Sequence, residues 1–281
     1  MSLSDVAFDR LSALLKRRSG ILLPREKAYL LESRLAPVAR RTGFADVTAM
    51  AAALDSRDDG ELALAIFEAM LNNETLFFRD GAPFELLRTA VLPALRQARA
   101  ATRRLRIWCA AASTGQEPYS VAMLLAADEA AWAGWNVEIV ATDLSQAALD
   151  RAETGLYSQF EVQRGLPIQS LIKHFDKEGS QWRLSRDVRR RVRFRRVNLC
   201  EPFAHLGPFD VVLCRNVLMY LDPATKTDIL TRIRSLMPDD GYLLLGAAET
   251  VLGLSVDFRP DWVNRGLYLV GEGDTRRAAN G

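Results

Sequence analysis

The stretch L-R-I-W-C-A-A-A-S-T-G-Q-E-P-Y-S-V-A-M, residues 105–123, decides the fold of this chain. Its first five residues alternate in the two-residue period of a β-strand. The small residues Ala110–Gly115 follow, and they leave backbone that a ligand can approach closely. Pro118 then stands where a helix starts and needs no N–H donor. Strand, turn and helix together predict the first crossover of a doubly wound, mostly parallel α/β sheet, which binds ligands at the carboxyl ends of its strands.

Glu117 is an unusual residue for the end of such a turn. Its carboxylate would repel a phosphate and attract a cation such as an amino group. The turn also lacks the G-x-G-x-x-G fingerprint, which disfavours a NAD-binding oxidoreductase. S-adenosylmethionine (SAM), which carries an amino group, is therefore the leading candidate ligand.

The composition is that of an ordinary soluble globular protein. The chain has 281 residues, 49% of them hydrophobic and 26% charged, with a net charge of +2 that gives no general attraction to nucleic acid. Three scattered cysteines indicate buried thiols, and two histidines without a cysteine pair argue against a metal site. No segment approaches the roughly 20 apolar residues of a membrane span, and no signal peptide opens the chain, so we expect a cytosolic protein without membrane insertion.

Several breaks in the pattern suggest the domain organisation. We expect an N-terminal helical domain over residues 1–80, a helical linker over 81–100 and a sheet domain over 101–270. Residues 155–197 interrupt the alternation of strand and helix, and we expect an inserted antiparallel β-ribbon there. The polar tail 271–281 is expected to be disordered.

Two polar segments of the first 80 residues allow two interpretations each. On the helix expected over 26–41, Arg34, Arg40 and Arg41 form either a solvated face or a docking surface for an acidic partner. The segment N-N-E-T-L-F-F-R-D, residues 72–80, is either a capped turn with an aromatic staple or a functional loop. Arg79 beside two phenylalanines favours the functional loop.

Asp143 ends the strand predicted over 137–142. It can accept hydrogen bonds from the hydroxyls of a ribose, or it can cap the helix that begins near Ser145. The spacing of 26 residues from Glu117 favours ribose binding.

The most basic window of the chain, residues 186–196, carries seven arginines and looks like part of the inserted ribbon. It is either a solvated strand face or a surface that attracts an acidic protein or nucleic acid. No aromatic residues interleave in the way that supports single-strand binding.

Polar residues without an obvious packing role fall at the ends of the predicted strands. In a doubly wound sheet these ends meet at one crevice. The set at the strand ends is Glu117, Asp143, Asn198, Arg215 and Asn216. Asn73, Thr75 and Arg79 would have to join them from the helical domain.

Five motifs in this order resemble the CheR family of class I SAM-dependent methyltransferases. They are N-E-T-x-F-F-R-D, A-S-T-G-Q-E-P-Y-S, A-T-D-L-S, V-N-L and C-R-N-V-L-M-Y-L-D, and the resemblance covers about residues 5–270. It implies methylation of glutamate side chains on chemoreceptors, with S-adenosylhomocysteine as the second product.

The resemblance also implies roles for single residues. Glu117, after Gly115 of the turn, would hold the amino group of SAM, Asp143 would hold the ribose, and Asn198 and Leu199 would lie by the adenine. The remaining cofactor residues would be Gly115, Arg215, Asn216, Asn73, Thr75 and Arg79. On the acceptor side, we expect Arg79 to orient the substrate carboxylate and Tyr220 to line the methyl-transfer channel.

Partners follow from the same resemblance. Arg34, Arg40 and Arg41 would dock on the acidic methylation helices of the receptor. In some members the inserted ribbon grips a receptor pentapeptide, but this chain has D-K-E-G-S-Q in place of the Gly-rich turn, so we expect direct docking without that tether.

Two alternatives remain open, a SAM-binding docking module without turnover and a nucleic-acid methyltransferase. The second is disfavoured because no Asn/Asp-Pro-Pro-aromatic motif follows the strand before Asn216.

Overall fold

The computed structural model describes residues 3–54, 60–71 and 73–271, and the chain divides into two compact units. The first unit comprises Met1–Asn72 and Tyr220–Thr225, and the second comprises Asn73–Met219 and Lys226–Gly281. This division differs from the boundary at residue 80 that the sequence suggested, because residues 73–80 group with the second unit. The tail expected to be disordered lies, from residue 272 onward, outside the described residues.

The first unit is helical, as the sequence predicted. Its helices are α1 (Asp5–Ser19), α2 (Ala28–Arg41), α3 (Val47–Ala52) and α4 (Glu61–Met70). Helix α1 begins because the Ser4 side chain accepts a hydrogen bond from the Ala7 N–H, and it ends at Gly20 in the left-handed conformation. The face of α2 predicted to point inward is buried, with Leu31, Leu35 and Val38 at most 2% exposed.

A short segment from much later in the chain belongs to this first unit. The Leu22 N–H donates to the carbonyl oxygen of Tyr220 (3.0 Å), and Ile21 forms an antiparallel bridge with Leu221. Residues 220–225 are therefore fixed by the strand-like connection that follows α1.

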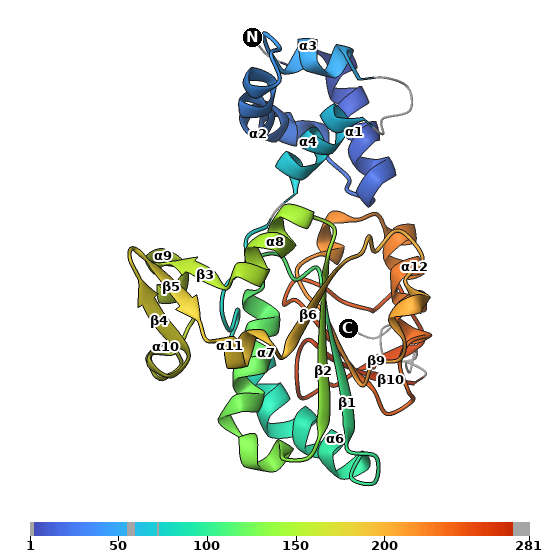
Figure 1. The fold of residues 1–281 in the computed structure, drawn as a ribbon. Coiled ribbons are helices and arrows are strands. Elements are labelled where there is room, and N and C mark those ends of the chain that lie inside the picture. The colour runs from blue at the N-terminus through green and yellow to red at the C-terminus, as the bar shows by residue number, and fades with distance from the viewer. Residues whose placement is uncertain (1–2, 55–59, 72, 272–281) are drawn as a thin grey trace. The chain divides into compact units, whose positions relative to one another are not determined.

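The second unit is built on a seven-stranded sheet with the strand order β6-β2-β1-β7-β8-β10-β9 (Figure 1). Strand β1 is parallel to β2 and β7, β7 is parallel to β8, and β10 is antiparallel to both β8 and β9. The expectation of a doubly wound, mostly parallel sheet is confirmed. The strands are β1 (Arg104–Ala110), β2 (Asn136–Asp143), β6 (Val192–Arg196), β7 (Val211–Cys214), β8 (Tyr242–Leu245), β9 (Phe258–Pro260) and β10 (Leu267–Val270).

Helices flank this sheet (Figure 1). They are α5 (Ala82–Leu86), α6 (Leu92–Ala98), α7 (Gln116–Ala127), α8 (Gln146–Thr154) and α12 (Pro223–Arg234). A π-helical turn over Leu87–Val91 joins α5 to α6. Phe84, Leu87 and Leu95 belong to the same buried cluster as Ile107 of β1. Residues 81–100 are therefore part of the core and not a linker.

A separate antiparallel sheet confirms the predicted insertion and corrects its extent. It consists of β3 (Leu156–Ser158), β5 (Gln181–Leu184) and β4 (Phe175–Glu178), with α9 (Gln159–Gln163) and α10 (Ile168–His174), and it projects to one side of the main sheet (Figure 1). The Arg-rich window is not part of it. That window forms α11 (Arg186–Arg189) and β6, and β6 pairs in parallel with β2. A two-residue period fits both arrangements, so the period alone did not separate them.

Trp108 anchors the centre of the main sheet. It is fully buried between Phe203 and Phe209, with ring centroids 5.2 and 5.4 Å away. Its indole N–H donates to the Thr142 hydroxyl of the neighbouring strand (2.9 Å), so the one polar atom of the ring is satisfied. This packing and the hydrogen bond to Thr142 fix β1 against β2 near the carboxyl ends of the two strands.

Candidate active site

The small-residue turn after β1 is a tight turn in the left-handed region. Ala111, Ser113 and Gly115 have φ values of 59°, 51° and 92°. The Ala112 N–H donates to the carbonyl oxygen of Thr142 (2.8 Å), and the Gly115 N–H donates to that of Ala112 (3.0 Å). The turn leads directly into α7, so Glu117 lies in the first turn of that helix.

Gly115 is required by protein packing. A Cβ at this position would lie 2.9 Å from the Cβ of Ala152 and 3.2 Å from the Tyr157 hydroxyl. Its φ of 92° also disfavours any residue with a side chain. The sequence predicted that small residues here would leave backbone open to a ligand. At Gly115, however, the space that a side chain would need is filled by Ala152 of α8 and Tyr157 of the small sheet.

Glu117 forms a buried ion pair with Arg215. The Arg215 Nη1 donates to Oε2 of Glu117 at 2.9 Å, and the two side chains are 1% and 11% exposed. Burial raises the pKa of Glu117, and the Arg215 guanidinium opposes that rise. The other carboxylate oxygen, Oε1, has no hydrogen-bond partner among the described residues.

The same guanidinium reaches the segment before α5. Its Nη2 donates to the carbonyl oxygen of Arg79 (2.9 Å) and to the carboxylate of Asp80 (2.7 Å). The Cζ atom of Arg215 lies over the Phe84 ring, 5.5 Å from the ring centroid. Asp80 was not singled out from the sequence, although it ends the quoted motif at residues 72–80.

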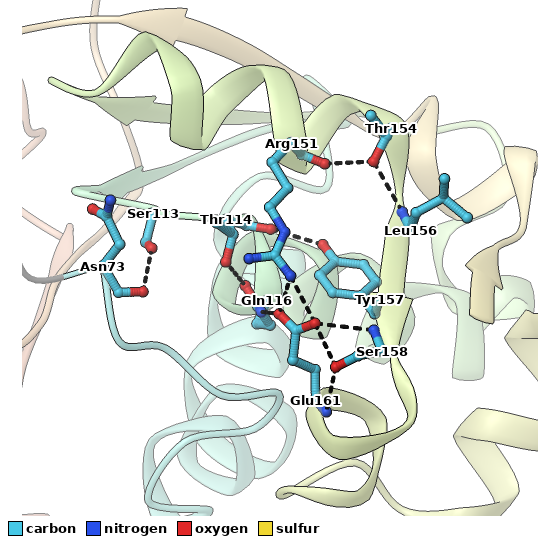
Figure 2. Close-up of polar contacts among 10 residues, drawn as sticks. All are labelled: Asn73, Ser113, Thr114, Gln116, Arg151, Thr154, Leu156, Tyr157, Ser158 and Glu161. Atoms are coloured by element: carbon cyan, nitrogen blue, oxygen red, sulfur yellow. Dashed lines mark hydrogen bonds and ion pairs between the residues drawn. The ribbon is translucent and has the colours of Figure 1, made fainter. Parts of the chain in front are cut away.

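Segment 73–80 is also tied to the turn after β1. The Ser113 hydroxyl donates to the carbonyl oxygen of Asn73 (2.8 Å, Figure 2), and the Phe78 N–H donates to the Ser120 hydroxyl (2.9 Å). Phe77 is fully buried against Tyr157. The sequence suggested that these residues would come from the helical domain, whereas the contacts make them part of the second unit.

Asp143 fastens the turn from the other side. Its carboxylate accepts hydrogen bonds from the N–H groups of Ser113 (2.8 Å) and Ser145 (2.9 Å). Burial raises its pKa, and these amides oppose the rise. Helix α8 is capped by Ser145, whose side chain accepts from the Ala148 N–H. The simple capping role considered for Asp143 is therefore filled by its neighbour.

Asn198 and Leu199 follow β6 at the same edge of the sheet. The Val197 N–H donates to the carbonyl oxygen of Asp143 (3.0 Å), which places this segment beside the end of β2. Asn198 donates to Glu201 (3.1 Å) and accepts from the Cys200 N–H, and Leu199 is 9% exposed.

Asn216 lies directly after Arg215 and has a φ of 60°. Its N–H donates to Glu249 at 2.7 Å, and so do the N–H groups of Val217 and Met219. Glu249 is 9% exposed and was missed in the sequence. The available signal was the one that pointed to Asp143, an acidic residue shortly after an apolar strand.

A second polar network joins the turn to the small sheet (Figure 2). Thr114 donates to the Gln116 side chain (2.8 Å), whose amide lies 3.4 Å from Glu161. Glu161 also accepts from Arg151 and from the hydroxyl of Ser158 (both 2.8 Å). The Tyr157 hydroxyl completes the link by donating to the Thr114 carbonyl oxygen (2.8 Å). The sequence offered no signal for this network, because its members are ordinary polar residues.

The charges near α7 leave an excess of negative charge. Glu117 pairs with Arg215 and lies within electrostatic reach of Glu249 and Arg79, and Asp80 pairs with the same Arg215 guanidinium. Three negative groups against two positive groups favour a ligand with a positive charge at this place. Arg79 is half-buried, and its only side-chain bond among the described residues is to the Glu74 carbonyl oxygen (3.0 Å).

The structure thus brings together Asn73, Arg79, Glu117, Asp143, Asn198, Arg215 and Asn216 through direct contacts and shared neighbours. Thr75 is half-buried in the same segment as Asn73. Gly115 and Leu199 also belong to the second unit, whereas the remaining predicted residues, Tyr220, Arg34, Arg40 and Arg41, lie in the first unit. Tyr220 is fixed there through its carbonyl oxygen, Arg40 and Arg41 are exposed, and Arg34 donates to the carbonyl oxygens of Met70 (2.9 Å) and Leu71 (3.4 Å) at the end of α4.

The Arg-rich window is less basic in the fold than in the sequence. Arg191 pairs with Glu129 (3.2 Å), and Arg193 pairs with Glu138 (3.1 Å). Arg196 donates to the Leu144 carbonyl oxygen. Three arginines of this window therefore have partners inside the second unit.

The described residues offer neither a cluster of metal ligands nor a membrane-spanning helix. They contain no group of three or more histidine, cysteine, aspartate or glutamate side chains placed to hold a metal ion. Within the same residues, no helix has the length and apolar character needed to cross a membrane.

Comparison with known proteins gives matches over both units. The profile described as "CheR methyltransferase, all-alpha domain" matches residues 7–71, and "CheR methyltransferase, SAM binding domain" matches residues 73–262. "Chemotaxis protein methyltransferase Cher2" of Pseudomonas putida is 40% identical over 258 residues, 90% of this chain and 94% of that protein. "Chemotaxis protein methyltransferase 1" of Pseudomonas aeruginosa is also 40% identical, over 90% of this chain and 93% of its own length. The junction of the two matched regions coincides with the division between the structural units.

Affinity for SAM should fall as the pH is lowered from about 7 to about 5. Burial raises the pKa of Glu117, so its carboxylate takes up a proton at a higher pH than an exposed glutamate does, and the protonated form does not attract an ammonium group. Calorimetric titration should therefore give an affinity that rises with pH through the pKa of Glu117.

The variant Glu117→Gln separates this effect from others. It should bind SAM more weakly at every pH and should show a shallower pH dependence. Glu153→Gln, on the exposed side of α8, is the matched control and should behave as the wild type does. A wild-type affinity that does not change over this pH range would contradict the role of Glu117.

Proposed function

Because the chain belongs to the CheR methyltransferase family, we propose that it transfers methyl groups from SAM to glutamate side chains of chemoreceptors. The products are glutamate methyl esters and S-adenosylhomocysteine, and the role is chemotactic adaptation. The enzyme acts in the cytoplasm, on the cytoplasmic methylation helices of the receptors, and it needs no metal. A SAM-binding domain is a property of the family.

The observation that carries the proposal is the buried Glu117–Arg215 pair within a cluster that has an excess of negative charge. The free Oε1 of Glu117 suits the amino group of SAM, and the Asp143 carboxylate at the end of β2 suits the ribose hydroxyls. The segment after β6, with Asn198 and Leu199, suits the adenine. Arg215 and Asn216 complete the cofactor side, together with Asn73 and Thr75.

Methyl transfer from SAM to a carboxylate needs no general acid or general base. A carboxylate oxygen of the substrate attacks the methyl carbon in line as the carbon–sulfur bond breaks, and the electron pair remains on sulfur. A glutamate carboxylate, with an ordinary pKa of about 4.3, is already ionised near neutral pH, so no general base is needed. Rate enhancement therefore comes mainly from holding the two reactants in line.

Arg79 is the residue that we assign to orient the acceptor carboxylate. Its guanidinium uses one donor on the Glu74 carbonyl oxygen, which leaves a planar pair of donors for a carboxylate. Tyr220 is assigned to the methyl-transfer channel, with its hydroxyl as a hydrogen-bond donor to the acceptor.

The receptor-docking surface is assigned to the exposed side of α2. Arg41 and Arg34 line a groove together with Pro37, Val38 and Glu68, and Arg40 is exposed on the same helix. Arg34 also anchors the end of α4, so its charge is partly used within the unit. Arg40 and Arg41 are therefore the residues most available to acidic methylation helices. Direct docking of this kind needs no pentapeptide tether.

Turnover should depend on Arg79. With radiolabelled SAM and a cytoplasmic receptor fragment, wild-type protein should form base-labile methyl ester, and Arg79→Ala should lower kcat about 100-fold through misplacement of the acceptor. The matched control is Arg88→Ala, because Arg88 is exposed and, among the described residues, pairs only with Glu85.

Three outcomes of that assay would contradict the proposal. Binding of SAM without ester would indicate a docking module without turnover. Label on nucleic acid would indicate a nucleic-acid methyltransferase. Equal turnover in Arg79→Ala would remove Arg79 from the acceptor site.

The KM for the receptor fragment should depend on Arg40 and Arg41. The double variant Arg40→Ala, Arg41→Ala should raise this KM several-fold while the SAM affinity stays the same, because surface charges steer and hold an acidic partner without touching the cofactor. Added salt should raise the wild-type KM in the same direction.

The control for docking is a second pair of exposed arginines, Arg186→Ala with Arg190→Ala. This pair should leave the KM unchanged. A rise in KM for the control pair, and none for the α2 pair, would place the receptor on the Arg-rich window instead.

A further inference from the structure

Glu249 collects four backbone N–H groups on one carboxylate. Oε1 accepts from Val217 (2.9 Å) and Met219 (3.1 Å), and Oε2 accepts from Asn216 (2.7 Å) and Gly246 (2.8 Å). No arginine or lysine pairs with Glu249 among the described residues. The buried carboxylate is therefore held by amide dipoles, and it fixes the segment 216–219 in return.

The space around this carboxylate is closed by Gly246 at the end of β8. A Cβ on Gly246 would lie 2.7 Å from Nδ2 of Asn216, 2.8 Å from Oε2 of Glu249 and 2.9 Å from the Asn216 nitrogen. The Glu249 N–H donates back to the Gly246 carbonyl oxygen (2.9 Å). The turn 246–249 and the segment 216–219 thus fit each other without room for one further carbon atom.

This arrangement holds a residue in the left-handed conformation in place. Asn216 has a φ of 60°, a conformation that is uncommon for residues with a side chain, although asparagine adopts it more readily than most. The N–H of Asn216 is one of the four groups bound by Glu249. The residue before it is Arg215, whose side chain is buried on Glu117 and Asp80.

We propose that Glu249 is a positioning residue for the cofactor site. Its carboxylate sets the backbone of Asn216, and through it the direction in which Arg215 and Asn216 leave β7. The inference rests on the proposed use of SAM. Both oxygens of its carboxylate are bound to the four backbone N–H groups, so we assign Glu249 to act through the segment that it binds.

The variant Glu249→Gln tests this inference with almost no change in shape. A glutamine keeps one oxygen that can accept two N–H groups, but its amide nitrogen cannot accept the other two. The dissociation constant and KM for SAM should rise about tenfold or more, whereas the KM for the receptor fragment should stay the same. A purely structural role would lower the melting temperature and the active fraction without changing the KM for SAM in the folded fraction.

One further variant and two controls complete the test. Gly246→Ala should weaken SAM binding in the same way, because its methyl group displaces Asn216 and Glu249. Glu129→Gln is an exposed control in the second unit, and Gly60→Ala is a control glycine with nothing within 4 Å of the added carbon. Both controls should keep wild-type values.

Amide hydrogen exchange gives a readout that does not depend on activity. In the wild type, the amides of Asn216, Val217 and Met219 should exchange slowly, and in Glu249→Gln they should exchange faster while those of β1 do not change. Unprotected amides in the wild type, or an unchanged KM for SAM in folded Glu249→Gln, would overturn the inference. Failure of the wild type to bind SAM would instead overturn the proposed function.

Discussion

The buried guanidinium of Arg215 is the constraint on which the site of the second unit depends. It extends from the end of β7 and meets Glu117 at the start of α7 and the residues Arg79 and Asp80 before α5. Three segments that lie far apart in the sequence are joined by one side chain that is 1% exposed. An arginine suits this task because its planar group offers several donors in fixed directions and keeps its charge when buried.

A buried ion pair such as Glu117–Arg215 adds little to the free energy of unfolding, so we relate it to the ligand site and not to stability. Removing charged groups from water often costs more than their attraction returns, and loss of one partner typically costs about 3–5 kcal/mol. Burial raises the pKa of Glu117, and the Arg215 guanidinium opposes this rise and so favours the ionised carboxylate, whose Oε1 has no hydrogen-bond partner among the described residues. Asp143 is a second buried carboxylate at the edge of the sheet, and backbone N–H groups, including that of Ser113 in the turn, take the place of an arginine as its donors.

The sequence predicted much of this fold, for identifiable reasons. Alternation in 105–109 and the apolar run before Cys214 predicted the strands, and the convergence of strand ends in a parallel sheet predicted which polar residues would meet. The partner of Glu117 could not be predicted, because it depends on the direction of a long side chain. The boundary at 72–73 was missed because segment 73–80 is fixed by contacts with Ser113 and Ser120 and not by a break in composition.

The most direct measurement is a titration of the Glu117 carboxyl carbon by NMR, in the wild type and in Arg215→Met, with Glu117→Gln to assign the signal. If Arg215 keeps this buried carboxylate ionised, its pKa must be clearly higher in Arg215→Met than in the wild type, and SAM must bind more weakly at neutral pH. An identical pKa in the two proteins would contradict the account.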